Sequence, residues 1–367
     1  SEVPLGLFLS GGLDSSLIAA FMHKIVGSGI KTFSIGFEEK EYSELPYSRR
    51  VSRMIDSDHE EIMVAPHDMM ETIKPVVWYR ETPISEVSDI PMYLLCKAAS
   101  KKVTVALTGE GGDEVFGGYR KYQFENVARR IGPLANPVSK RLLSGRVASA
   151  ILPQRVCTAL DLFLVRDRYR RYYRWFSYFR DEELAEFLRE DRRELLSAAD
   201  PYARLMEKKR FRSNVEEMQY LDIKAWLPDD LLLRADRLSM ASGLEARVPF
   251  LDHRLVELGF RLPLRLKVRG STGKYIVKKI AEQYLDHHAI YRKKVRLSVP
   301  VGRWFRGELR EFLAEHLTRS NSFSAEYLRR SAIERLVSEH AKGAKDHHKK
   351  LWMLLNLELW RDAFISA

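Results

Sequence analysis

A seven-residue loop rich in glycine and serine, Ser10 to Ser16 (SGGLDSS), constrains the fold of this chain most strongly. An apolar run from Val3 to Leu9 precedes it, and apolar residues at helical spacing follow from Leu17 to Ile25. A buried strand, a tight glycine turn and the start of a helix together present backbone amides to an anion. Asp14 places a carboxylate where that anion should bind, which indicates a cation between the two. The loop therefore predicts a binding site for a magnesium-bound phosphate group.

Apolar or β-rich runs alternate with helical patterns in the first third of the chain. The alternation predicts an α/β fold with a doubly wound parallel sheet. In such sheets ligands bind beyond the carboxyl ends of the strands, so the segments that follow those ends are candidate walls of a site. The expected strands are Val3 to Leu9, Lys31 to Phe37, His59 to Val64 and Lys102 to Leu107, and the expected helices are Leu17 to Ile25, Ser43 to Ile55, one that Pro66 opens, and Ile90 to Ala99.

From about Tyr122 the strand patterns disappear and helical stretches dominate to the end of the chain. We therefore expect a nucleotide-binding α/β lobe over residues 1–125 and a mostly helical lobe over residues 126–367, with Gly132, Pro133 and Pro137 marking a break between them. Two basic runs, residues 166–174 and 208–212, stand out in the second lobe. They are typical either of a solvated or domain-facing helix surface or of a nucleic-acid groove with interleaved tyrosines.

The composition excludes several classes of protein. The chain has 367 residues and a net charge of +11, and no apolar run approaches the length of a membrane helix. Cys96 and Cys157 lack metal-ligand spacing and are typical of reduced thiols, so we expect a cytoplasmic protein without a membrane partner. The chain opens at Ser1, immediately before its first strand, which favours a fragment or a processed part whose charge balance belongs to a larger protein.

A second glycine-rich loop, Thr108 to Glu114 (TGEGGDE), also follows an apolar strand. It holds three carboxylates, Glu110, Asp113 and Glu114, within five residues. Such crowding is unfavourable unless a cation or a positive substrate compensates it. The spacing does not fit a dinucleotide-binding loop, and Gly270 to Lys274 (GSTGK) is too short for a Walker loop. A role linked to magnesium is the stronger interpretation.

In these two loops the chain resembles the PP-loop superfamily of ATP pyrophosphatases, and within it the synthetase domain of glutamine-dependent asparagine synthetases. Three further blocks resemble the same family in the same order, so the similarity spans essentially the whole chain. The blocks are Leu227 to Asp252 (LPDDLLLRADRLSMASGLEARVPFLD), Gly270 to Lys279 (GSTGKYIVKK) and Leu351 to Arg361 (LWMLLNLELWR).

The resemblance implies ATP and Mg²⁺ as cofactors and gives individual residues a role. Four residues would be catalytic: Glu110 in forming an acyl-adenylate, Lys274 in reaching the phosphates, and Asp14 and Asp113 in carrying magnesium. The remaining ATP-binding positions would be Leu9 and Ile35 at the adenine, Thr108 and Gly109 along the nucleotide, and Ser10, Gly11, Gly12 and Ser15 around the pyrophosphate.

The implied reaction is the synthesis of asparagine from aspartate. ATP would convert aspartate into β-aspartyl-AMP with release of pyrophosphate, and attack by ammonia would then give asparagine and AMP. Glutamine-using members carry an upstream glutaminase domain with an N-terminal cysteine nucleophile, whereas this chain opens with Ser1. We therefore expect that domain in a parent protein or on a separate chain, or else the use of free ammonia. Smaller departures are Thr108, where serine is usual, and residues 295–298, where a Gly-Phe pair is usual.

Several alternatives stay open at this point. Glu245 and Arg247 form either a buried structural ion pair or a border of the amino-acid substrate and the ammonia path, and Asp236 with Arg237 has the same ambiguity. The acyl substrate could be another carboxylate, as in β-lactam-forming ligases, peptide cyclases or glycan amidotransferases. A tRNA-modifying enzyme and a catalytically silent scaffold are weaker alternatives. The oligomeric state stays open too, with a homodimer as one alternative.

Overall fold

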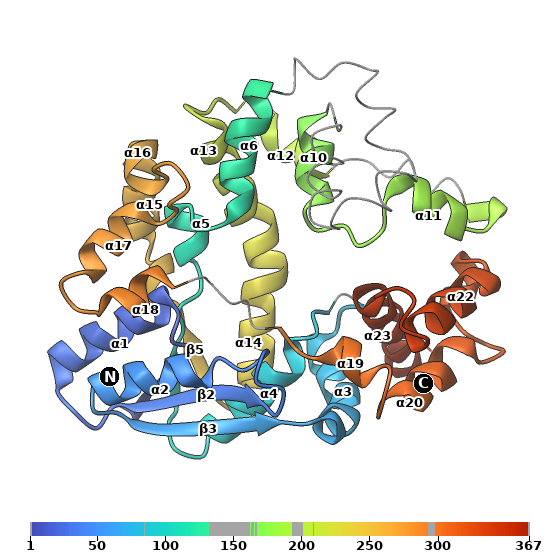
Figure 1. Ribbon diagram of the computed structural model, residues 1–367, viewed down its shortest axis with the longest axis horizontal. Helices are drawn as coiled ribbons and strands as arrows, with labels where there is room; N and C mark the ends of the chain where they lie inside the picture. Colours follow the sequence, from blue (N-terminus) through green and yellow to red (C-terminus); the bar gives the residue numbers. More distant parts are fainter. Residues whose placement is uncertain are drawn as a thin grey trace.

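Five parallel strands form one sheet in the order β3-β2-β1-β4-β5 (Figure 1). The computed structural model describes residues 2–83, 85–131, 162, 165, 167–192, 201–207, 209–292 and 298–365. The predicted doubly wound parallel sheet is confirmed, and β2 has the predicted bounds. The strands are β1 (Leu5–Phe8), β2 (Lys31–Phe37), β3 (Asp58–Val64), β4 (Val105–Leu107) and β5 (Glu245–Arg247).

The fifth strand corrects the prediction that strands end before Tyr122. β5 comes from the second half of the chain and pairs with β4, so that Leu107 lies opposite Arg247. Its ends are fixed by backbone bonds from Glu245 N–H to the Thr104 carbonyl and from Thr108 N–H to the Arg247 carbonyl, both 2.9 Å. The strand is only three residues long and lies at the sheet edge, so it carries no apolar alternation that a sequence pattern could reveal.

Helices cover both faces of the sheet, as alternate residues of β1 show. Phe8 belongs to a core cluster with the inner faces of α3 and α4. Leu7 and Leu9 belong to a second cluster with α1 and α2. Because successive strand residues point to opposite faces, this division places the two helix pairs on opposite sides. These helices are α1 (Leu13–Val26), α2 (Leu45–Met54), α3 (Pro66–Arg80) and α4 (Asp89–Ala99).

The rest of the described chain is helical and surrounds the sheet. In Figure 1, α15 to α18 lie beside α1, whereas α19 to α23 gather at the other end of the long axis. η3, a π-helix, continues directly into α14 and contains Pro228, which removes one backbone donor. The proposed lobe boundary at residue 125 remains a prediction. Gly132, Pro133, Pro137, Cys157, Arg166, Lys208 and residues 295–297 lie outside the described residues.

The bounds of these elements are as follows: α5 (Gly112–Phe116), α6 (Arg120–Ile131), α10 (Arg168–Arg174), α11 (Asp181–Phe187), α12 (Pro201–Met206), α13 (Asn214–Leu221), η3 (Asp222–Leu232), α14 (Leu233–Met240), η4 (Pro249–Leu251), α15 (His253–Arg261), α16 (Leu264–Lys267), α17 (Tyr275–Ala281), α18 (His287–Tyr291), α19 (Val301–Trp304), α20 (Arg310–Thr318), α21 (Ser324–Tyr327), α22 (Arg330–Ala341) and α23 (His348–Phe364).

The C-terminal helix α23 is part of the same core as the sheet. Trp352 is 1% exposed in the cluster that holds Phe8, and its indole N–H donates to the Ser85 carbonyl at 3.2 Å. Cys96 is fully buried in this cluster, and burial together with the charge of Glu110 raises the pKa of its thiol to about 12. Among the described residues, no helix combines the length and the hydropathy needed to cross a bilayer.

Trp352→Ala should lower the free energy of unfolding by about 3 to 5 kcal/mol, because it removes a fully buried indole and leaves a cavity. Trp78→Ala is the matched control, since Trp78 is 57% exposed, and it should cost no more than about 1 kcal/mol. Urea unfolding of both variants measures the difference. Equal losses would show that α23 is not part of the core.

Candidate active site

The two glycine loops lie next to each other because they follow neighbouring strands. β1 and β4 pair in parallel with Leu7 opposite Leu107, and a loop follows the carboxyl end of each strand. Parallel strands bring their carboxyl ends to the same edge, which is where open α/β sheets bind ligands. The structure therefore brings together the two loops that the sequence singled out.

The first loop turns sharply and passes against the start of α2. Gly11 has a φ of 66°, and a Cβ at this position would lie 2.5 Å from the carbonyl carbon of Tyr47. Only glycine fits there without displacing the backbone. Inside the loop, Ser10 Oγ lies 3.0 Å from Ser15 Oγ and accepts the N–H of Gly12 at 3.2 Å. Hydroxyls and an amide thus cluster at the N-terminal end of α1.

The glycines of the second loop leave room for two carboxylates. A Cβ at Gly112 would lie 2.7 Å from Oδ1 of Asp14, and one at Gly118 would lie 1.8 Å from Oδ1 of Asp113. A Cβ at Gly109 would lie 3.2 Å from the Cβ of Asp14. Side chains at these positions would push the loops apart, so the glycines allow Asp14 and Asp113 to approach each other.

The ammonium group of Lys274 lies between the two carboxylates. Its Nζ donates to Oδ2 of Asp14 and lies 2.9 Å from Oδ1 of Asp113, and the side chain is 6% exposed. Lys274 has a φ of 53°, in the left-handed region that bulky residues rarely adopt. Burial lowers the pKa of Lys274, but Asp113 and Asp14 together outweigh it, so the pKa is raised. The ammonium therefore remains charged and balances one of the two carboxylates.

Asp14 and Asp113 also fit a magnesium ion bound to phosphate oxygens. The two carboxylates converge on one cation, which here is the Lys274 ammonium. Magnesium in nucleotide sites is commonly held by one or two carboxylates together with substrate phosphates. Among the described residues, no group of three or more His, Cys, Asp or Glu side chains could hold a metal. A metal at this position would therefore depend on the phosphates of its ligand.

Glu114, the third carboxylate of the second loop, is buried behind the first two. Its Oε1 accepts the hydroxyl of Tyr119 at 2.7 Å. Burial and the negative charge of Asp113 raise the pKa of Glu114 to about 7. The backbone carbonyl of Glu114 accepts Nε2 of Gln219 at 2.6 Å, which fastens α5 to α13. Glu114 thus stabilises the second loop through its contacts with Tyr119 and Gln219, whereas Asp113 faces Lys274.

A second group of charged side chains surrounds Glu110. Arg234 Nη2 lies 3.9 Å from Glu110 Oε1, and Arg234 Nε lies 3.7 Å from Asp89 Oδ1. Burial raises the pKa of Glu110, with Asp230 adding to the effect and Arg234 opposing it. Oε2 of Glu110 is buried and has no hydrogen-bond partner among the described residues. Leaving a buried carboxylate oxygen unpaired is costly, so this oxygen indicates a place for a polar ligand.

Asp89 anchors this second group at its base. The side chain is fully buried, lies 3.1 Å from Nε of Arg80 and accepts the hydroxyl of Ser85 at 3.0 Å. Burial raises the pKa of Asp89 to about 6, although Arg234 and Arg80 oppose the shift. Buried ion pairs thus join α3, α4 and α14, and Arg234 of α14 lies next to Glu110 as well.

The residues expected around the nucleotide lie where β1, β2 and β4 end. The N–H of Leu9 donates to the Phe33 carbonyl at 2.8 Å, and Ile35 is 9% exposed in the neighbouring strand. The hydroxyl of Thr108 is buried without a hydrogen-bond partner in the described part of the chain. Gly109 follows it directly and contacts Asp14. The position of these residues is compatible with an adenine next to the phosphates, and their contact with it stays a prediction.

Glu245 and Arg247 lie on the edge strand β5, where the backbone carbonyl of Arg247 accepts the N–H of Thr108 at 2.9 Å. Arg247 Nε lies 2.6 Å from Glu245 Oε1, with 53% and 54% of the two side chains exposed. The ion pair is therefore present but exposed, which contradicts the alternative of a buried structural pair; the alternative of a border to the substrate stays a prediction. Asp236 is exposed on α14, and Arg237 pairs with Glu81 at 2.9 Å. The structure does not bring these residues next to Glu110 or Lys274 within hydrogen-bond distance.

Two arginines of the basic runs are engaged in ion pairs. Arg171 donates from Nε and Nη2 to the carboxylate of Glu125 at 2.7 and 2.9 Å, and the Glu125 side chain is fully buried. Arg212 pairs with Glu216 at 2.8 Å. Arg171 is 12% exposed and Arg212 63% exposed, so the two contacts fit the interpretation of these runs as solvated or domain-facing helix surfaces.

Sequence reasoning missed Arg234, Asp89, Arg80 and Arg292 as contributors to the site. Arg234 lies inside the block Leu227 to Asp252, so its position in that block was the only available signal. Asp89 and Arg80 sit in ordinary helical patterns, and their pairing appears only when α3 and α4 pack. Arg292 lies just after α18 and donates a hydrogen bond to Gly11 of the first loop, from which it is far apart in the sequence.

The parallel sheet and the two glycine loops at its carboxyl edge define a PP-loop-like, doubly wound α/β domain. The asparagine synthase family model matches residues 1–362, and the chain therefore belongs to the asparagine synthase family. That match covers all five strands, both loops and Lys274.

Curated relatives agree with this membership. Asparagine synthetase [glutamine-hydrolyzing] 1 of Bacillus subtilis is 32% identical over 373 residues, which cover 100% of this chain and 57% of that protein. Asparagine synthetase [glutamine-hydrolyzing] 3 of the same organism is 28% identical over 311 residues, covering 80% of this chain and 45% of that protein. Amidase chry2 of Gibberella zeae is 22% identical over 354 residues, covering 88% and 53%. The chain thus spans about half the length of the curated relatives that it matches.

Replacing Glu114 by glutamine should change how stability depends on pH. The folded pKa of about 7 exceeds the ordinary value of 4.5, so folding retains a proton on Glu114 between these two pH values. Stability from this group is then present at low pH and falls as pH rises toward 7. Glu114→Gln should gain about 2 to 4 kcal/mol relative to the wild type between pH 4.5 and 7.5. Urea unfolding across that range measures the gain.

Glu257→Gln serves as the control for the same substitution at the surface, because 60% of the Glu257 side chain is exposed. A pH-independent difference for Glu114→Gln would show that folding does not raise the pKa of Glu114.

Proposed function

We propose that this domain is an ATP-dependent amide-forming ligase that makes asparagine from aspartate and ammonia. The observation that carries the proposal is the meeting of Asp14, Asp113 and Lys274 where two glycine loops converge. Membership in the asparagine synthase family supports the same reaction class. A carboxylate is a poor electrophile, so ATP first converts it into β-aspartyl-AMP and releases pyrophosphate; ammonia then yields asparagine and AMP.

The first loop would hold the pyrophosphate, and the two carboxylates, Asp14 and Asp113, would hold the magnesium bound to it. Ser10, Ser15 and the Gly12 amide supply hydrogen-bond donors at the N-terminus of α1, which favours an anion. When bound by Asp14 and Asp113, magnesium would offset the charge of the phosphates. The Lys274 ammonium lies within reach of the same place and would stabilise charge that develops on the leaving group.

The acyl substrate would bind in the second group of charges. Glu110, Asp89 and Arg234 offer both signs of charge in a largely buried place, which suits an amino acid with one ammonium and two carboxylate groups. Burial strengthens the electrostatic interactions that these groups make with a bound ligand and excludes water, which would protect an acyl-adenylate from hydrolysis. Glu110 lies in the same loop as Asp113 and so connects the acyl site with the phosphate site.

Ammonia is the proposed direct nitrogen donor at this site. Two relatives are named glutamine-hydrolyzing, and the chain spans about half of their length. We propose that a glutaminase domain, in the parent protein or on a separate chain, supplies the ammonia. A cytoplasmic location remains a prediction, as does the oligomeric state.

The nearest alternative is a family ligase that activates another carboxylate. One relative is named an amidase, so not every relative that this chain matches is named an asparagine synthetase. β-Lactam-forming, peptide-cyclising and glycan-modifying enzymes would share the phosphate site and differ around Arg234. Ion pairing of Arg171 and Arg212 gives no support to a tRNA-modifying enzyme.

Pyrophosphate release from ATP with ammonium should rise at least about tenfold on adding aspartate, and much less with glutamate, β-alanine or succinate. Succinate lacks the ammonium and β-alanine lacks one carboxylate, and a lost charge-assisted contact costs about 1.5 to 3 kcal/mol, or at least tenfold. Glutamate has the same charged groups, but its extra methylene costs about 1 to 3 kcal/mol in a fitted site. Lys274→Ala is the inactive control and should abolish the stimulation. Equal stimulation by another carboxylate would replace aspartate as the substrate, and the absence of any stimulation would reject the ligase.

A further inference from the structure

We propose that Arg292 is a positioning residue that sets the conformation of the pyrophosphate loop. Its guanidinium holds the carbonyl of Gly11 on one side of the loop, so that the amide of Gly12 is presented on the other side. The inference rests on the proposed role of this loop, and it adds a residue to which neither the loop motif nor the family blocks point.

Arg292 contacts both the first loop and the N-terminal end of α2. Its Nε donates to the Gly11 carbonyl at 3.2 Å, and its Nη2 donates to Oε1 of Glu44 at 3.1 Å. The guanidinium carbon lies 4.0 Å from the centre of the Tyr47 ring. Only 7% of the Arg292 side chain and 9% of the Glu44 side chain are exposed. A buried arginine with this many fixed partners has little freedom to move.

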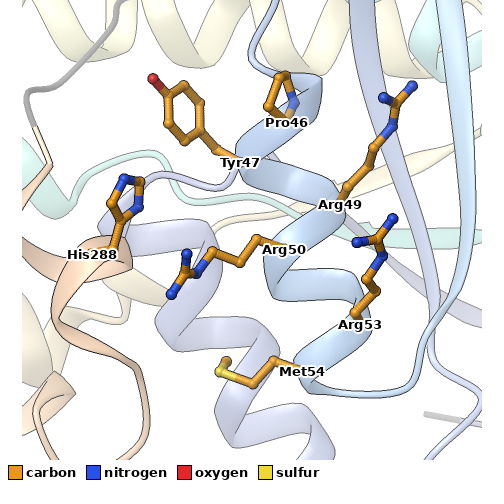
Figure 2. A pocket seen from close by; sticks show the side chains of 7 residues that line it. All are labelled: Pro46, Tyr47, Arg49, Arg50, Arg53, Met54 and His288. Atoms are coloured by element: carbon orange, nitrogen blue, oxygen red, sulfur yellow. The ribbon is translucent and has the colours of Figure 1, made fainter.

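These contacts tie the loop to the N-terminus of α2. Glu44 is the residue that precedes α2, and its carbonyl accepts the N–H of Tyr47 at 2.9 Å. Gly11 already packs against the backbone of Tyr47, where a Cβ would collide. The Arg292 N–H donates to the carbonyl of His288, whose ring stacks on Tyr47 at 6.0 Å. Figure 2 shows Tyr47 and His288 facing each other across one pocket.

The orientation of one peptide plane explains the effect on the loop. In a trans peptide the C=O and the following N–H point in opposite directions. Fixing the Gly11 carbonyl toward Arg292 therefore directs the Gly12 N–H away from it, toward Ser10 Oγ at 3.2 Å. Glycine resists rotation of this plane least of all residues. An external anchor is needed to keep the amide and the serine hydroxyls on the side of the anion.

Arg49 and Arg50, which line the pocket beside Tyr47, do not perform this role. Arg49 pairs with Glu61 at 2.6 Å and Arg50 pairs with Asp286 at 2.8 Å. Both side chains are about half exposed, and no contact to the glycine loop is among their described bonds. Arg50 projects toward the helix of His288, whereas Arg49 and Arg53 lie on the other side of α2 (Figure 2). Arg50 is therefore a matched control with the same charge on the helix that carries Tyr47.

Removing the charge of Glu44 distinguishes a positioning role of Arg292 from a direct contact between Arg292 and phosphate. A carboxylate next to the site repels anions, so if Arg292 acted only through its charge, removing the charge of Glu44 would tighten anion binding. If Arg292 acts by holding Gly11, Glu44 helps to fix the guanidinium. Its removal would then weaken anion binding in the same direction as loss of Arg292.

Calorimetric titration of the full chain with magnesium pyrophosphate tests the proposal. Arg292→Gln should raise the Kd about tenfold or more, as expected for a lost charge-assisted hydrogen bond. Glu44→Gln should raise it as well, and the double variant should be no worse than Arg292→Gln alone. Arg292→Lys should stay weakened, because an ammonium keeps the charge but lacks the planar fork. Arg50→Gln should match the wild type, and the KM for ATP should rise in the Arg292 variants while the KM for the carboxylate does not.

Tighter binding by Glu44→Gln, or full recovery by Arg292→Lys, would overturn the proposal in favour of a simple charge effect. An unchanged Kd for a folded Arg292→Gln would overturn it outright, and if that variant fails to fold, Glu44→Gln and Arg292→Lys decide. If the wild type itself binds no magnesium pyrophosphate, the proposed role of the loop fails, and this inference fails with it.

Discussion

The Lys274 ammonium between Asp14 and Asp113 is the interaction on which the site depends. The three residues come from the start of α1, from α5 and from the residue before α17, so their contact closes the sheet edge against the later helices. Two buried carboxylates this close would repel each other strongly without a cation. Gly112 and Gly118 make the approach sterically possible, and Lys274 makes it electrostatically stable.

The same two carboxylates would hold the magnesium that the proposed function requires. A metal bound by Asp14 and Asp113 would offset the charge of the phosphates, beside the charge that Lys274 already supplies. Arg292 and Glu44 provide the corresponding support on the other side of the first loop. The second group of charges, around Asp89 and Arg234, lies behind Glu110 and links the phosphate site to helices that form the core.

The meeting of the two glycine loops could be predicted from the sequence, because its signals are local. Glycine loops directly after apolar runs specify strand, turn and helix within a few residues, and β2 was located at its observed bounds. The strand β5 was missed because three residues at a sheet edge carry no periodic pattern. The exposure of Glu245 and Arg247 follows from the same edge position.

The group of charges around Glu110, Asp89 and Arg234 could not be predicted in the same way. Asp89 pairs with Arg80 and faces Arg234 only after α3, α4 and α14 have packed together, and no spacing in the chain reports that packing. The bond from Arg292 to the Gly11 carbonyl likewise joins residues from opposite ends of the chain and uses a backbone acceptor that any residue could offer. Such contacts depend on tertiary structure alone.

A double-mutant cycle between Lys274 and Asp113 tests the central claim most directly. Unfolding free energies of Lys274→Met, Asp113→Asn and the double variant at pH 7 give the coupling energy of the pair. We predict that Lys274→Met alone costs about 3 to 5 kcal/mol, because it leaves two buried carboxylates uncompensated, and that Asp113→Asn recovers at least about 2 kcal/mol of this loss in the double variant. Losses that add within about 0.5 kcal/mol would show that the two residues act independently, and would contradict the account.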